Sequence, residues 1–189
     1  MSTLPIPCRS CTMSPKLPED LDEVLRPIFD VLPIEQAMMP LVGASDAHRE
    51  AMEMVQNIVQ TPLLIARPKL VAGLWLYVDQ LDASHVVSQS ITTPSGSFWH
   101  AMMHRREGDF ANSHYWYRKV GKHPAMTKIF LAGGCAGAGT DNGRYDPHAF
   151  VDAVEVAHTQ HDDAGKAHPE LRAMQRHEWV ALFEWCAEH

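Results

Sequence analysis

Apolar residues recur at intervals of three and four along most of this chain, the spacing that gathers side chains on one face of an α-helix. Segments with this spacing are 18–33, 45–60, 68–91, 98–107, 110–121, 148–160 and 168–189. The stretch 70–78 is apolar enough to suit a strand, but its polar continuation to residue 91 keeps the helical interval. The pattern therefore predicts an all-α protein, either a helical bundle or a set of tetratricopeptide-like helical hairpins.

Residues typical of helix ends mark several boundaries. Ser45 is a candidate N-cap for the second helix, and Asp146 followed by Pro147 is a candidate start for a later one. Pro27 lacks a backbone N–H and is expected to bend or divide the first helix. The run 92–97, TTPSGS, is predicted to be a turn.

The chain has the length of one ordinary domain. Residues 1–17 are rich in proline, serine and cysteine and are predicted to be a flexible arm, with a single helical domain at 18–189. Cys8 and Cys11 form a CxxC that no second pair follows at zinc-ribbon spacing. The glycine-rich run 132–147 lacks the GK[ST] end of a phosphate-binding loop and is predicted to be a flexible connector or lid.

Two segments 29 residues apart, 72–85 and 101–114, echo each other. The coinciding residues are Ala72 with Ala101, Ser84 with Ser113 and His85 with His114. The second copy is tetratricopeptide-like, because Gly108 tolerates a bend, Asp109 can cap the following helix and Phe110 can fill the apex. A 29-residue offset is shorter than that repeat's usual period, so a bundle without repeat ancestry remains the alternative.

The region from Leu74 to Pro124 carries the runs LWLYVDQLDASHVVSQ, GSFWHAMMHRREGDF and NSHYWYRKVGKHP. These runs resemble an uncharacterised family with the hallmark Ser-His, then Gly-Ser-x-Trp-His, then His-Arg-Arg-Glu-Gly-Asp-Phe, then Tyr-Trp. No activity is established for that family, so the resemblance implies kinship and no function.

The charge balance narrows the classes of partner. The net charge is −7 with neutral histidines, which argues against nucleic-acid binding through a general basic field. No apolar run approaches the ~18 residues of a membrane span, and the first residues lack a secretory pattern, so a cytoplasmic protein is predicted. Eleven of the 12 histidines lie at or after His85.

A candidate metal site lies within the histidine-rich region. His100 and His104 are four residues apart and share a helix face, which Glu107 joins three residues later. Two imidazoles and a carboxylate suit Zn²⁺, Fe²⁺ or Mn²⁺, and His85 or His114 is expected to complete the set. Such an ion would activate water or polarise a carbonyl, as in a metal-dependent hydrolase or oxidoreductase.

The same region also suggests a metal-free pocket for a small molecule, an anion or a peptide. The candidate contacts are Trp99, Arg105, Arg106, Asp109, Trp116 and Tyr117. Arginines clamp carboxylates or phosphates, but arginine–carboxylate pairs also lock helical hairpins without any ligand. The sequence thus favours a helical binding or scaffold module, with the metal enzyme and a purely structural polar cluster as alternatives, and it leaves oligomerisation open.

Overall fold

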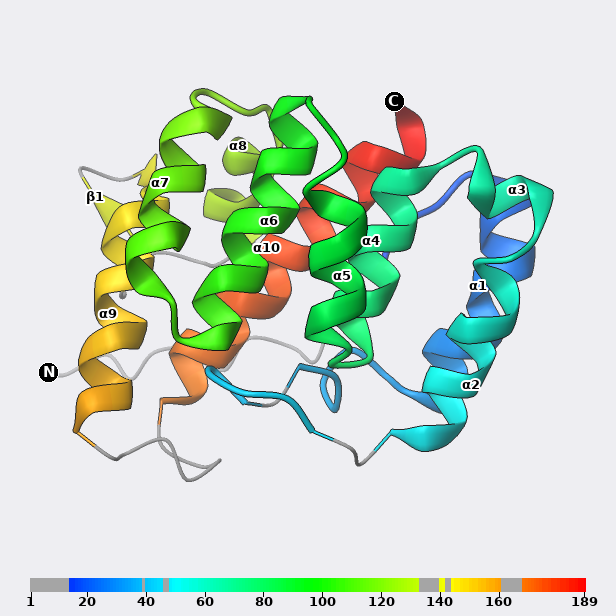
Figure 1. The fold of residues 1–189 in the computed structure, drawn as a ribbon, viewed down its shortest axis with the longest axis horizontal. Helices are drawn as coiled ribbons and strands as arrows, with labels where there is room; N and C mark the ends of the chain where they lie inside the picture. Colours follow the sequence, from blue (N-terminus) through cyan, green and yellow to red (C-terminus); the bar gives the residue numbers. More distant parts are fainter. Residues whose placement is uncertain (1–13, 39, 46–47, 133–139, 142–143, 161–167) are drawn as a thin grey trace, which may run out of the picture.

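The computed structural model describes residues 14–38, 40–45, 48–132, 140–141, 144–160 and 168–189, and these ranges hold ten helices and one two-stranded sheet (Figure 1). The helices are α1 (Glu19–Val31), α2 (Arg49–Ile58), α3 (Pro62–Ile65), α4 (Pro68–Tyr77), α5 (Leu81–Ser88), α6 (Pro94–Glu107), α7 (Phe110–Val120), α8 (Ala125–Ala132), α9 (Pro147–Thr159) and α10 (Pro169–Glu188). The strands β1 (Thr140–Asp141) and β2 (Arg144–Tyr145) pair antiparallel. The all-α prediction is confirmed.

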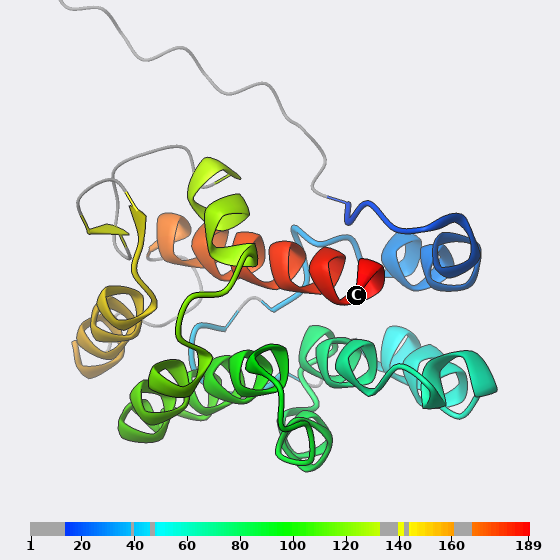
Figure 2. The ribbon, with the colours of Figure 1, turned by 90° about the horizontal axis from the view of Figure 1, so that it is seen from above.

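The C-terminal helix α10 is the centre of the arrangement. Figure 2 shows α10 between α8 on one side and the row formed by α4 and α6 on the other, with α5 on the far side of that row. Besides its hairpin partner α7 and its neighbour α4, helix α6 has α10 towards the core and α5 towards the outside. This placement gives the two faces of α6 different chemistry.

The core is built from aromatic rings around α10. Trp179 stacks on Phe183 with ring centroids 4.4 Å apart, and Trp99 of α6 lies 6.3 Å from Trp179. Gly73 allows this packing, because a Cβ there would lie 2.8 Å from Trp99 and 2.9 Å from Phe183. The Gly73 carbonyl also accepts a hydrogen bond of 2.8 Å from the indole nitrogen of Trp179.

The two echoing segments form hairpins of the same construction, α4–α5 and α6–α7. The equivalent residues Asp79 and Gly108 end the first helix of each hairpin in the left-handed region, with φ of 61° and 84°. The amide of Gln80 donates to Trp75 O at 2.9 Å, and the amide of Asp109, 29 residues later, donates to His104 O at 2.9 Å. These bonds close a helix end in the Schellman manner.

A side-chain bond between the two helices is also repeated. Ser84 Oγ donates to Ala72 O at 2.9 Å, and Ser113 Oγ donates to Ala101 O at 2.8 Å. The three residue types shared by the two segments therefore occupy the same places in both hairpins. The alanine carbonyl accepts the hydrogen bond, the serine hydroxyl donates it, and the histidine follows the serine on the second helix.

Several expected boundaries were wrong. The segment 68–91 is two helices, because Asp79 adopts positive φ where helical periodicity predicted continuation. The second helix begins at Arg49 instead of after Ser45, and residues 94–97 are the first turn of α6. The Thr93 hydroxyl caps that turn by accepting from Gly96 N at 3.3 Å. Pro27 lies within α1 without dividing it.

The predicted arm and connector fall partly outside the described ranges. Of residues 1–17, those from 14 onward contact the domain: Lys16 N donates to Glu184 Oε1 at 2.8 Å, and Leu17 packs against the core. Residues 1–13, with Cys8 and Cys11, and residues 133–139 lie outside the described residues. None of the helices in the described ranges is long and apolar enough to cross a membrane.

Candidate metal centre

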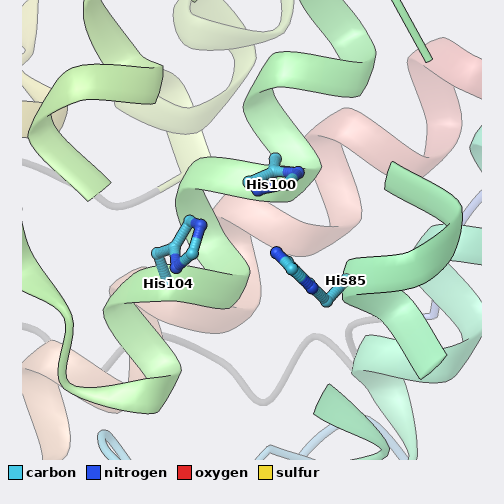
Figure 3. A group of neighbouring side chains, drawn as sticks. All are labelled: His85, His100 and His104. Atoms are coloured by element: carbon cyan, nitrogen blue, oxygen red, sulfur yellow. The ribbon is translucent and has the colours of Figure 1, made fainter. Parts of the chain in front are cut away.

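Three histidines meet between α5 and α6 (Figure 3). His100 and His104 lie one turn apart on α6, and His85 faces them from α5. Each imidazole offers one nitrogen such that all three nitrogens lie within 4.8 Å of one another. The ring centroids are separated by 4.7 Å for His85–His100, 5.3 Å for His85–His104 and 4.7 Å for His100–His104.

Hydrogen bonds on the Nδ1 side define how two of these imidazoles are held. His104 Nδ1 lies 3.1 Å from Glu107 Oε2, and a carboxylate only accepts, so this nitrogen carries the proton. His100 Nδ1 lies 3.3 Å from Ser88 Oγ, whose own hydrogen is directed to His85 O at 3.2 Å. Both contacts favour the tautomer in which Nε2 keeps its lone pair, the state that binds a metal.

Burial keeps the α6 histidines neutral. His100 is 2% exposed and His104 8% exposed, whereas His85 is half-buried. Burial, reinforced by His104 and His85, lowers the pKa of His100 to about 4. Burial also lowers the pKa of His104, although Glu107 opposes that shift. Imidazoles that stay uncharged near neutral pH are ready to coordinate an ion.

Trp116 of α7 covers one side of the cluster. Its ring lies 4.1 Å from the His100 ring at an angle of 35°. Lys119 Nζ lies 4.2 Å from the centre of the Trp116 ring, so the indole also has a cation–π contact. The arrangement holds His100 in place and puts an indole beside any ion bound by the cluster.

The donor set suits zinc best among the ions expected from the sequence. Three neutral imidazoles bind Zn²⁺ at 2.0–2.1 Å, leaving a fourth tetrahedral position for water. Ligand nitrogens around a tetrahedral Zn²⁺ ion are about 3.3 Å apart. The three nitrogens here lie within 4.8 Å of one another, so each pair would have to approach by at most about 1.5 Å to bind the ion. The half-buried edge at His85 is the side from which solvent reaches the cluster.

Two members of the expected metal set have other roles. Glu107 contacts His104 Nδ1, so it orients a ligand and is not among the three residues that converge. His114 lies on the other side of α7 from its expected partners: its Nδ1 is 2.7 Å from His148 Nδ1 and its Nε2 is 3.0 Å from Asp152 Oδ1. Of the five expected ligands, the structure therefore brings together His85, His100 and His104.

Arg105, an expected ligand contact, is fully buried against α10. Its Nη2 donates to Glu178 Oε2 at 2.5 Å, and its Nη1 donates to the Tyr117 hydroxyl at 2.9 Å. The Glu178 carboxylate also accepts from the Tyr117 hydroxyl at 2.5 Å and from the Tyr145 hydroxyl. Burial opposes the charged form of Arg105, but Glu178 outweighs it and the pKa lies above its ordinary value.

Of the remaining expected ligand contacts, Arg106 and Trp99 are buried, whereas Asp109 is exposed and caps a helix. Arg106, 1% exposed, donates from Nη2 to Asp79 Oδ1 at 2.6 Å and to Gly43 O at 3.2 Å. Asp109 caps α7 by accepting from Asn112 N at 3.1 Å, and Trp99 is 0% exposed. The two guanidiniums thus join segments of the chain to one another, which matches the structural alternative for these residues.

Sequence reasoning missed Glu178, Asp79, Ser88 and Tyr145. One signal was present for Glu178: it lies seven residues after Leu171 and four before Leu182, on the apolar face of α10. A carboxylate in that position is buried and needs a cationic partner. No local pattern identified Arg105 as that partner.

Protein-family models, curated proteins and solved structures were all compared with the chain, and none matched.

Proposed function

We propose that this protein binds one zinc-type divalent ion through His85, His100 and His104, with water in the fourth position. The observation that carries the proposal is the convergence of three imidazole nitrogens within 4.8 Å, on two helices, with no carboxylate among them. Three neighbouring imidazoles stabilise one another little unless an ion binds between them. The contacts of His100 with Ser88 and of His104 with Glu107 support it, since ligand histidines commonly have such partners on their other nitrogen.

Metal content and titration test this proposal. Purified protein is expected to hold about one equivalent of zinc, and chelator-treated protein is expected to take up one Zn²⁺ again. His100→Ala and His104→Ala should each abolish the high-affinity uptake, measured with no more than one equivalent of added zinc, whereas His48→Ala, which removes a histidine from the start of α2, should leave it unchanged. Wild-type protein that is folded and takes up no Zn²⁺, Fe²⁺ or Mn²⁺ would overturn the proposal.

Trp116 provides a second readout on the same site. Co²⁺ or Cu²⁺ bound beside its ring should quench tryptophan fluorescence, because the indole lies 4.1 Å from His100. Trp116→Phe should remove most of that quenching without removing the ion. Quenching that persists in Trp116→Phe would place the bound ion elsewhere.

Hydrolysis is the reaction class we propose for the bound ion. A zinc ion with three imidazole ligands lowers the pKa of its water to about 7 and so produces hydroxide near neutral pH. Zinc-loaded protein is expected to hydrolyse an activated aryl ester faster than the metal-free protein, and His104→Ala should not. Equal rates with and without zinc would restrict the site to metal binding.

A further inference from the structure

The internal repeat places a second histidine cluster on the molecule. His85 and His114 hold equivalent positions on α5 and α7, each one residue after the serine that bonds to the preceding helix. His85 faces α6, and α6 presents a histidine pair at positions 100 and 104. His114 faces α9, which presents His148 and Asp152 with the same four-residue spacing. The two hairpins therefore present similar arrangements at successive helix–helix contacts.

The contacts around His114 are specific. Its Nε2 lies 3.0 Å from Asp152 Oδ1, and because the carboxylate only accepts, the proton of His114 resides on Nε2. Nδ1 of His114 then carries a lone pair and accepts a hydrogen bond of 2.7 Å from Nδ1 of His148, whose proton must leave when an ion binds. The two rings are nearly parallel, at 6°, with centroids 5.1 Å apart. An aspartate on one nitrogen of a histidine whose other nitrogen carries a lone pair is the arrangement found in carboxylate–histidine–metal sites.

We propose that His114 and His148 form a second, weaker metal site for an imidazole-preferring ion such as Zn²⁺, Ni²⁺ or Cu²⁺. Both ligands bind through Nδ1, Asp152 orients His114 from behind, and water fills the other positions. The nitrogens must separate from 2.7 Å to about 3.3 Å to hold an ion at ordinary bond lengths. This proposal does not rest on the first site, whose ligands lie on other helices.

The surroundings of the pair allow an ion to enter and suit its charge. The His114 side chain is 23% exposed and that of Asp152 66% exposed, so the site opens to solvent. Asp146, which caps α9 through His148 N at 2.9 Å, adds a second carboxylate beside the ring. Arg118 is the opposing charge. Two protein ligands instead of three explain why binding here should be the weaker of the two events.

The test uses protein in which the first site is removed. His85→Ala/His100→Ala protein, checked for folding by circular dichroism, is titrated with Ni²⁺ and with Zn²⁺. One ion per chain is expected to bind, and adding His114→Ala or His148→Ala should abolish it. Adding Asp152→Asn should weaken it about ten-fold or more, as loss of such a partner does. His177→Ala on the same background is the matched control and should change nothing.

The reverse variant separates this proposal from the first. His114→Ala/His148→Ala protein should keep the high-affinity zinc ion and lose only the weaker one. If an alanine variant does not fold, His114→Gln and His148→Gln are used, since glutamine keeps a polar group there. Folded His85→Ala/His100→Ala protein that binds no Ni²⁺ or Zn²⁺, or binding that survives His148→Ala or His148→Gln, would overturn the second site. The first site stands or falls on high-affinity uptake by the wild-type protein and its loss in His100→Ala and His104→Ala.

Discussion

Helix α6 carries two polar clusters of opposite construction. Towards α10, Arg105 meets the carboxylate of Glu178, and two tyrosine hydroxyls complete the set. Towards α5, His100 and His104 meet a third imidazole from His85, and no carboxylate lies among the three. The first cluster balances its charges within the protein. The second gathers three imidazoles whose nitrogens converge within 4.8 Å.

The difference indicates what each cluster contributes. A buried charge without a partner costs several kcal/mol, so removing one member of the arginine cluster should destabilise the fold. Three neutral imidazoles cost far less to bury and return little stability, because they hardly attract one another. A cluster of that kind is informative about a ligand, whereas the arginine cluster is informative about the fold.

The largest expected effect comes from breaking the balanced cluster. Glu178→Ala leaves the Arg105 guanidinium buried beside two tyrosines and should lower the free energy of unfolding by about 3–5 kcal/mol. Urea denaturation of the metal-free protein measures it. Glu188→Ala, an exposed change on the same helix, should cost almost nothing. A loss below about 1 kcal/mol for Glu178→Ala would contradict the role given to this cluster.

The next effect depends on the ion. Zn²⁺ at 100 times its dissociation constant should stabilise the folded protein by about 2.7 kcal/mol, because only the folded state assembles the three histidines. The same addition to His100→Ala should give no stabilisation through this site. Thermal melting with and without zinc compares the two proteins. An equal shift in both would assign the effect to another part of the chain.

The buried His123 gives a third histidine environment, in which the stability of the protein should depend on pH. His123 Nδ1 accepts from Ala125 N at 3.2 Å, its Nε2 lies 3.1 Å from Ser95 Oγ, and burial followed by Lys69 lowers its pKa to about 4. The unfolded chain, with a pKa of about 6.5, binds the proton more readily, so protonation favours unfolding. The stability that neutral His123 provides is fully present above about pH 6.5. It falls by on the order of 2 kcal/mol as the pH is lowered towards 4.

Urea denaturation at pH 7 and pH 4.5 measures this dependence. His123→Phe removes one titrating group while keeping a ring beside Phe98, and it should make the decline of stability with acid shallower, with His100 still contributing. The same decline in wild type and His123→Phe would show that other groups are responsible. His189→Ala, at the exposed end of the chain, serves as the control.

The smallest expected effects compare the two repeated hairpins. Ser84→Ala and Ser113→Ala each remove one buried hydrogen bond to a helix carbonyl and should cost about 1 kcal/mol apiece. Similar losses in urea denaturation would support the equivalence of the hairpins. A large loss for one serine and none for the other would mean that the shared bond has different weight in the two copies.

Much of the framework could be predicted from local patterns. Helical periodicity indicated the all-α fold, and the Gly108–Asp109 pair indicated the reversal between α6 and α7. The equivalent reversal at Asp79 was missed by the periodicity, although the 29-residue echo implied it. Positive φ is uncommon outside glycine, although aspartate adopts it more readily than most residues, and here Asp79 Oδ1 also accepts a hydrogen bond from Arg106.

The sequence by itself determined that His100 and His104 share a face, because four residues on a helix make about one turn. It also determined that His85 and His114 stand at equivalent places in two hairpins. Only the tertiary structure decided that His85 joins the α6 pair while His114 turns to α9, and that Arg105 meets Glu178, 73 residues away. Local spacing fixes the direction of a side chain on its own helix, but its partner depends on which helix packs against that face.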